Sequence, residues 1–113
     1  MTTTLDVEVR VDHGEATFAF AGDIDGAARE AFNRAYAEAV DTGAESIRLD
    51  FSDVQYINST GIALIVGLLG RARADRLRVT ACGLTAHYRA IFEITRLSDF
   101  MTIDDGSSSG SRG

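Results

Sequence analysis

Two hydroxyl side chains, Ser59 and Thr60, stand at the front of an almost wholly apolar stretch, residues 56–73, with the sequence YINSTGIALIVGLLGRAR. A hydroxyl or amide oxygen at the start of a helix accepts hydrogen bonds from the free amides of the first turn. Asn58 and Ser59 are therefore both candidates for a helix N-cap. A phosphate on Ser59 would meet the same free amides and the positive end of the helix dipole. The residues thus predict a helix start that tolerates phosphorylation of Ser59, and the two roles are compatible.

The helix expected over residues 60–74 has two unlike sides on a helical wheel. Bulky residues suited to packing on a sheet share one side, and they are Ile62, Ile65, Val66, Leu69 and Ala72. Small residues flanked by Leu64 and Leu68 lie roughly opposite, and they are Ala63, Gly67, Gly70 and Ala74. Because each interior glycine costs a helix about 1 kcal/mol relative to alanine, we expect another backbone to approach this side closely. That backbone belongs either to a neighbouring helix of the same domain or to a partner protein.

The other residues that could do chemistry are scattered along the chain. Asp23 and Asp25 are expected in a loop over residues 22–26, either solvated or as part of a partner surface. Neither histidine, His13 or His87, has a second ligand at metal-binding spacing, and the single cysteine, Cys82, is expected to be a small buried residue. A Gly-x-Ser-x-Gly elbow and a phosphate-binding P-loop are both absent from the sequence. These patterns predict no catalytic residue, no metal site and no cofactor.

The net charge of the chain and the length of its apolar runs argue against some classes of partner. The 113 residues include 17 acidic and 11 basic side chains, a formal net charge of −6, which argues against a nucleic-acid or anionic membrane surface. The longest apolar run, residues 62–69, is far shorter than the ~20 residues needed to cross a bilayer. Because the first residues do not resemble a signal peptide, a cytoplasmic location is expected.

Strands are predicted to alternate with helices around the serine. Residues 5–11 and 17–21 alternate apolar and polar side chains, which predicts an opening β-hairpin. Further elements are expected in the order helix 27–42, strand 46–51, helix 60–74, strand 77–81, helix 84–95 and strand 100–103. This order predicts one α/β domain over residues 1–103 with a mixed sheet. Residues 104–113, rich in Gly, Ser and Asp, are expected to form a disordered tail.

The segment LDFSDVQYINSTGIALIVGLLGRAR, residues 49–73, resembles the signature segment of STAS domains, specifically the bacterial anti-sigma factor antagonists. GDID, residues 22–25, is similar to the family's loop after the second strand. LTAHYRAIFEITRLSDFMTI, residues 84–103, is similar to the segment from the third helix into the last strand. The resemblance covers most of residues 5–103 and implies a STAS-type mixed sheet with helices mainly on one face.

The resemblance also implies a partner and a site. In that family the anti-sigma factor is a serine kinase that phosphorylates the serine of an Asp-Ser-[Ser/Thr]-Gly motif, and the unphosphorylated antagonist binds this kinase. Ser59 matches the phosphorylated serine, and Thr60 and Gly61 match the next two positions. The partner-binding residues expected from the motif, the loop and the small helix side are Asp23, Asp25, Asn58, Ser59, Thr60, Gly61, Ala63 and Gly67.

Two functions from different classes stay open at this point. The first is a regulatory protein that binds an anti-sigma factor and is switched off by phosphorylation at Ser59. The second is a scaffold or assembly module that is never phosphorylated, favoured by Asn58, which stands where the family usually has Asp. Residues 104–113 also lack the pattern of the further helix with which the family usually ends, which leaves a homodimer open. A small-ligand or nucleotide sensor is a third hypothesis, and no enzymatic activity is expected.

Overall fold

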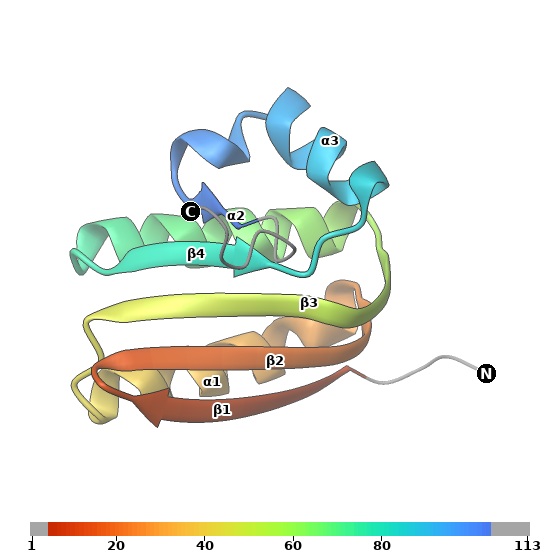
Figure 1. The fold of residues 1–113 in the computed structure, drawn as a ribbon. Coiled ribbons are helices and arrows are strands. Elements are labelled where there is room, and N and C mark those ends of the chain that lie inside the picture. The colour runs from red at the N-terminus through yellow and green to blue at the C-terminus, as the bar shows by residue number, and fades with distance from the viewer. Residues whose placement is uncertain (1–4, 105–113) are drawn as a thin grey trace.

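The computed structural model describes residues 5–104, in which five strands form one sheet (Figure 1). The strands are β1 (Asp6–Asp12), β2 (Glu15–Ile24), β3 (Ser46–Ile57), β4 (Arg78–Cys82) and β5 (Thr102–Ile103). The helices are α1 (Arg29–Asp41), α2 (Ser59–Ala74) and α3 (Ala86–Ile94), with short 3₁₀ turns η1 (Gly26–Ala28) and η2 (Leu97–Asp99). The spatial order of the strands follows the chain, with β1 antiparallel to β2 and every later pair parallel. The predicted mixed sheet is confirmed.

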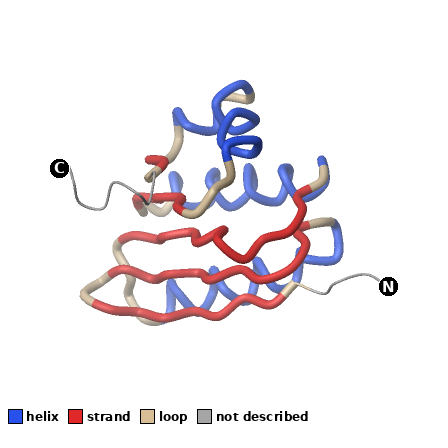
Figure 2. Tube along the Cα trace, turned by 45° about the vertical axis from the view of Figure 1, so that its right-hand side comes forward, coloured by secondary structure: helices blue, strands red, loops and turns tan. Residues whose placement is uncertain are grey.

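The helices lie on one side of the sheet, and the apolar core fills the space between the two layers (Figure 2). Every second residue of β2 and of the first half of β3 is buried, as expected for strands with one covered face. The ring of Phe20 stacks on Phe32 of α1 at 5.2 Å, and Phe51 meets Phe92 of α3 edge-on at 5.8 Å. These contacts hold the helices against the strands, so the predicted placement of the helices mainly on one face is confirmed.

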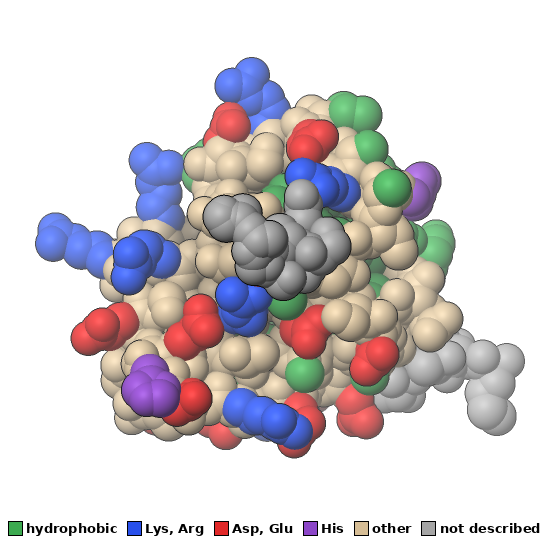
Figure 3. Space-filling view, in the orientation of Figure 1, with side chains coloured by type: hydrophobic (Ala, Val, Ile, Leu, Met, Phe, Trp, Pro, Cys, Tyr) green, Lys and Arg blue, Asp and Glu red, His purple; other side chains and the backbone are tan. Residues whose placement is uncertain are grey.

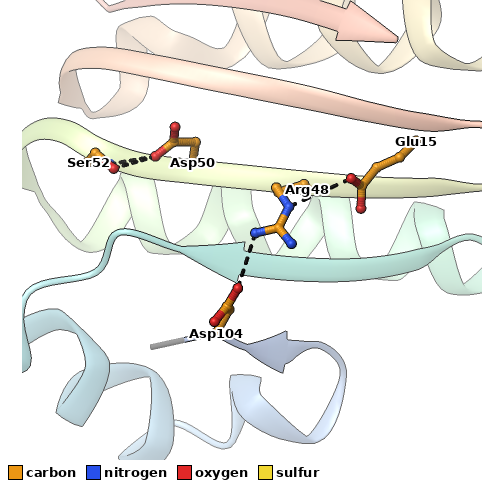
Figure 4. Close-up of polar contacts among 5 residues, drawn as sticks. All are labelled: Glu15, Arg48, Asp50, Ser52 and Asp104. Carbon is orange, nitrogen blue, oxygen red and sulfur yellow. Dashed lines mark hydrogen bonds and ion pairs between the residues drawn. The ribbon is translucent and has the colours of Figure 1, made fainter. Parts of the chain in front are cut away.

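The opposite face of the sheet is open and polar. Figure 3 shows acidic and basic side chains interspersed on this side of the molecule. Arg48 lies at its centre, with its Nη1 3.3 Å from an oxygen of Asp104 and its Nε 3.7 Å from an oxygen of Glu15 (Figure 4). On the same strand, Asp50 accepts hydrogen bonds from the backbone and side chain of Ser52. Arg48 thereby connects β2 and β3 with the residue that follows β5.

Two strands are longer than the sequence predicts, and one predicted loop is absent. Gly22, Asp23 and Ile24 form the end of β2 rather than a loop, because parallel pairing with β3 continues to Ile57 through two register shifts. The polar side chain of Asp23 is tolerated there because alternate residues of β2 face the open side. Residues 105–113 of the predicted tail lie outside the described residues, whereas the Asp104 backbone N–H donates to the Ala81 carbonyl at 2.7 Å.

Candidate functional site

Asn58, and not Ser59, is the N-cap of α2. Its backbone is extended, and its Oδ1 accepts a hydrogen bond from the Gly61 amide at 2.8 Å. Its own amide donates to the Ile24 carbonyl at 3.2 Å, and its carbonyl accepts from the Ile62 amide at 2.9 Å. The cap is thus fixed to the end of β2 on one side and to the first turn of α2 on the other. Of the two cap candidates in the sequence, the structure selects Asn58.

Ser59 is the first residue of α2, and its side chain is exposed, as is that of Thr60. Because Asn58 supplies the cap, the Ser59 hydroxyl is not needed to hold the helix start. The first amides of a helix have no partner within the helix, and they carry the positive end of its dipole. An exposed hydroxyl in this position can receive a phosphoryl group without disturbing a buried contact.

Gly61 fixes the position of Ser59 relative to the sheet. A β-carbon at Gly61 would lie 2.0 Å from the Ile24 carbonyl oxygen, so only glycine allows the helix to approach the end of β2 this closely. A β-carbon at Gly26 would lie 3.3 Å from Thr60 Cγ2, which places η1 beside the same helix turn. The structure therefore brings the end of the GDID segment and the NSTG segment together.

The two aspartates of the GDID segment have different roles. Asp25 caps η1, because its Oδ1 accepts a hydrogen bond from the Ala27 amide at 3.0 Å. Asp23 pairs with Tyr56 in the β2–β3 register. Both carboxylates are half-buried at the end of the sheet that carries Ser59. They do not converge on a metal site, and residues 5–104 contain no cluster of three metal-ligating side chains.

The outward side of α2 is small, apolar and open. Its exposed residues after Thr60 include Ala63, Val66, Gly67, Gly70 and Ala74. A β-carbon at Gly67 or Gly70 would meet no described atom within 4 Å. The expectation that a neighbouring helix of the domain approaches these glycines is therefore wrong for the described residues. We call these five residues the small face of α2.

The predicted core side of α2 is wrong at two positions. Val66 is 46 % exposed, whereas Leu68 is only 4 % exposed. The physical reason is that α2 packs against α1 as well as the sheet, which turns its buried side toward Leu68. Between the two helices lies a groove of about 200 Å³, lined by Phe32, Tyr36, Ala63, Leu64, Gly67 and Leu68 with Arg29, Asn33 and Arg71. The small face of α2 is continuous with this groove through Ala63 and Gly67.

A buried tyrosine supports the α1 side of the groove. The Tyr36 hydroxyl donates to Asp75 at 2.5 Å, and the Arg71 guanidinium lies 4.2 Å from the centre of the Tyr36 ring. Burial, and then the Asp75 carboxylate, raise the pKa of Tyr36 far above its usual value. The Arg71 Nη1 also donates to Asn33 at 3.1 Å. The sequence indicated Tyr36 only as a core position, because its long-range partner Asp75 has no local signal.

Two further tyrosines near Ser59 were not predicted as site residues. The Ile57 amide donates to the Tyr88 hydroxyl at 2.9 Å, which ties α3 to the strand end just before the cap. Tyr56, one residue earlier, is 54 % exposed. The only signal for Tyr56 in the sequence was its place two residues before Asn58. His87 meets the Tyr88 ring edge-on and is exposed, as the sequence predicted.

Cys82 lies on the open sheet face and is half-buried. Burial raises the pKa of its thiol, and a hydrogen bond with Arg48 opposes that rise. His13 is exposed, and its Nδ1 lies 2.8 Å from a carboxylate oxygen of Asp12. Neither residue contacts the Ser59 site.

The family model described as "Mlab, STAS domain" matches residues 7–103. The chain therefore belongs to this family of STAS domains. Two similar relatives are anti-sigma-B factor antagonists, one from Staphylococcus aureus (strain NCTC 8325 / PS 47) at 31 % identity and one from Staphylococcus epidermidis at 28 %. Each alignment covers 65 residues, 58 % of this chain and 60 % of the relative, so only about three fifths of each relative's length is matched.

Solved structures with the same fold include anti-sigma factor antagonists. Unphosphorylated SpoIIAA has a TM-score of 0.69 at 19 % identity, over 90 % of this chain and 88 % of the other. Phosphorylated Bacillus SpoIIAA has a TM-score of 0.68 at 20 % identity, over 94 % and 96 %. A putative anti-sigma factor antagonist from Thermotoga maritima has a TM-score of 0.71 at 17 % identity, over 91 % and 90 %. These likenesses confirm the predicted STAS-type fold. In residues 5–104, no helix is long and apolar enough to cross a membrane.

Proposed function

We propose that this domain is a regulatory protein of the anti-sigma factor antagonist type, which binds a partner anti-sigma factor with serine kinase activity and is released by phosphorylation of Ser59. The observation that carries the proposal is the exposed Ser59 at a helix start capped by another residue, beside an open small face. The anti-sigma factor antagonists among the relatives and the solved structures support the class of partner.

In the unphosphorylated state, the small face of α2 is the docking surface. A β-carbon at Gly67 or Gly70 would meet no described atom within 4 Å outside the helix itself, so a partner backbone can approach the helix closely. The exposed side chain of Val66 and the groove beside Ala63 supply apolar surface for burial. Asp25, which caps η1 beside the first turn of α2, would add an acidic group next to this surface.

In the phosphorylated state, the domain keeps its fold and loses its partner. Transfer of the γ-phosphoryl group of ATP to the Ser59 hydroxyl adds a charge of about −1.5 to −2. The helix dipole and the first-turn amides stabilise that charge, and the Asn58 cap is unaffected. Asp23 and Asp25 belong to the same end of the sheet, so the phosphate adds to the negative charge there. A partner that tolerates a hydroxyl at this end is repelled by the dianion.

The decisive experiment is site-resolved phosphopeptide mass spectrometry on the protein isolated from its own cells, during growth and under stress. We expect a phosphate on Ser59 whose occupancy changes with the condition. The Ser59→Ala variant is the control, because it removes the acceptor hydroxyl and should lose the phosphate. A well-covered peptide without phosphate in any condition would reject the switch.

Capture of the partner tests the second half of the proposal. The Ser59→Ala variant should retain the partner anti-sigma factor during affinity purification, and Ser59→Asp should lose it. Thermal unfolding of both variants should match the parent, because the Ser59 side chain is exposed. Equal capture by Ser59→Asp and Ser59→Ala would contradict release by charge.

A constitutive scaffold is the alternative function, and Asn58 is the observation that favours it. The amide keeps the hydrogen bond to Gly61 but lacks the charge of the aspartate usual at this position. If the kinase requires that charge, Ser59 is never modified. The Asn58→Asp variant then gains phosphorylation that the parent lacks, and light scattering of the parent shows stable self-assembly. A parent that is both monomeric and phosphorylated contradicts the scaffold.

A further inference from the structure

Arginines gather at the end of the domain opposite Ser59. Four of the eleven basic residues lie within RARADRLR, residues 71–78, although the chain has a formal net charge of −6. Figure 3 shows basic side chains projecting at the left, where Figure 1 places the end of α2 and the start of β4. Arg71 is engaged by Tyr36 and Asn33. The remaining three, Arg73, Arg76 and Arg78, are exposed.

The nearby carboxylates already have partners. Asp75 accepts from Tyr36, Asp99 pairs with Arg96 at 3.0 Å, and Glu15 lies 3.7 Å from Arg48. Within residues 5–104, Arg73, Arg76 and Arg78 have no carboxylate partner. The dipole of α2 favours Arg73 in its last turn, but it does not account for Arg76 and Arg78, which lie beyond the helix. This end of an acidic domain therefore carries basic charge that the described part of the domain does not neutralise.

Two of these arginines, Arg73 and Arg78, line an open pocket of about 650 Å³ between β4 and the segment that leads to β5. We call it the basic pocket. Its lining residues include Arg73, Leu77, Arg78, Thr80, Phe100 and Thr102, and also the carboxylates Glu15 and Asp99, which are paired with Arg48 and Arg96. Phe100 is 50 % exposed, and the Arg73 guanidinium lies 5.5 Å from the centre of its ring. The pocket thus offers an apolar surface next to cationic groups and hydroxyls.

One side of the basic pocket is an incomplete sheet edge. β5 pairs with β4 only at Thr80 and Ala81, so Arg78 and Val79 have no strand partner on that side among the described residues. An extended peptide can add to such an edge through main-chain hydrogen bonds. A nucleic acid or a small anion would use the arginines but not the edge. The combination of open edge, apolar surface and unneutralised arginines favours a peptide.

We infer that the basic pocket binds an extended acidic segment of a protein, with its carboxylates on Arg73 and Arg78, its backbone along the edge of β4 and an apolar side chain against Phe100. Guanidinium–carboxylate pairs are strong, directional hydrogen bonds. This surface lies at the opposite end of α2 from Ser59. The domain can therefore hold a second protein while the small face of α2 binds or releases the first.

The probe is a fluorescein-labelled peptide that alternates glutamate with leucine, titrated with the full chain and followed by fluorescence anisotropy at low and moderate salt. The same peptide with glutamine at every glutamate tests the need for charge. We expect the glutamate peptide to bind and the glutamine peptide to bind at least about tenfold more weakly, because charge-assisted pairs carry the recognition. Absence of binding by the glutamate peptide, or equal binding of both, overturns the inference.

Matched charge variants test the location. Arg73→Gln combined with Arg78→Gln should weaken the glutamate peptide about tenfold or more. Arg10→Gln combined with Arg34→Gln removes the same charge from exposed positions elsewhere and should change the affinity less than about twofold. Circular dichroism melting of both double variants shows whether the fold is kept. Equal weakening by the two pairs means that only net charge matters, which overturns the inference. Tighter binding of a single-stranded oligonucleotide of the same charge also overturns it.

Discussion

The two ends of α2 differ in how well their residue types suit the local backbone geometry. At the first end, each residue suits its geometry, since Asn58 caps the helix and Gly61 alone fits against the Ile24 carbonyl. At the other end, the Arg76 amide bonds to the Arg73 carbonyl and the Leu77 amide to the Ala72 carbonyl, the pattern of a Schellman motif. Arg76 occupies the left-handed position of this motif, with φ of 62°, where glycine is usual.

The difference shows where stability and binding have shaped the chain. A residue that fits its backbone needs no further explanation, because folding alone favours it. A residue whose type is unfavourable for its backbone conformation can indicate that something other than stability favours it at that position. Arg76 is such a residue, and it lies in the sequence between Arg73 and Arg78, the two arginines that line the basic pocket. The start of α2 is therefore constrained by packing, whereas binding at the proposed peptide site would account for the arginine at its end.

The largest expected effect is at Gly61. Gly61→Ala should lower the free energy of unfolding by about 3 kcal/mol, because the new methyl group meets a backbone oxygen of β2 that cannot move without distorting the sheet. Urea denaturation with a constant m-value measures this. A loss below about 1 kcal/mol would mean that α2 shifts freely along the sheet, since overpacking costs at least that much. The close approach would then not fix the position of Ser59.

The cap gives the next largest effect. Asn58→Ala should lower stability by about 1 kcal/mol, because the Gly61 amide loses its acceptor. Asn58→Asp keeps an acceptor at the same place and adds charge at the positive end of the dipole, so its stability should equal or exceed that of the parent. Thermal melts of the three proteins compare them. A loss of stability in Asn58→Asp would show that its charge is unfavourable beside Asp23 and Asp25.

Much of the fold was predictable because its signals are local. Strand alternation, helical spacing and the order of elements are properties of neighbouring residues, and these predicted the opening hairpin and the alternating helices correctly. The extent of β2 and β3 was not predictable, because Asp23 and Gly22 are typical of loops and only the parallel partner strand holds them in the sheet. The buried side of α2 was misplaced for the same reason, since α1 determines that Leu68 rather than Val66 is covered.

The candidate site likewise has features that the local sequence predicted and features that it could not predict. The motif around Ser59 predicted which residues lie at the helix start, but Asn58 and Ser59 were equivalent as caps until the backbone geometry distinguished them. The contact of Gly61 with Ile24, the hydrogen bond from Ile57 to Tyr88 and the basic pocket all join residues far apart in the sequence. Such pairings carry no signal at the level of neighbouring residues.

Arg76→Gly tests the other end of α2 with an effect of opposite sign. Glycine adopts a positive φ without strain, so the variant should be more stable by about 1 kcal/mol in thermal or urea unfolding. The acidic peptide should bind more weakly to the same variant, because one unneutralised arginine is gone. Together these results would show that Arg76 lowers the stability of the domain and strengthens its binding of the acidic peptide. A more stable variant with unchanged peptide affinity would leave Arg76 without a role in the basic pocket.

The smallest expected effect is at Gly67, which receives the same substitution as Gly61 in an open environment. Gly67→Ala should raise stability by about 0.8 kcal/mol, because alanine favours the helix and its methyl group meets nothing within 4 Å. Gly67→Glu should leave the domain folded for the same reason, yet it places a charged side chain where the partner backbone must approach. Capture of the anti-sigma factor should then fail while the melting curve is kept. If Gly67→Glu unfolds the domain, the small face is covered by the protein itself; if it folds and still captures the partner, docking occurs elsewhere.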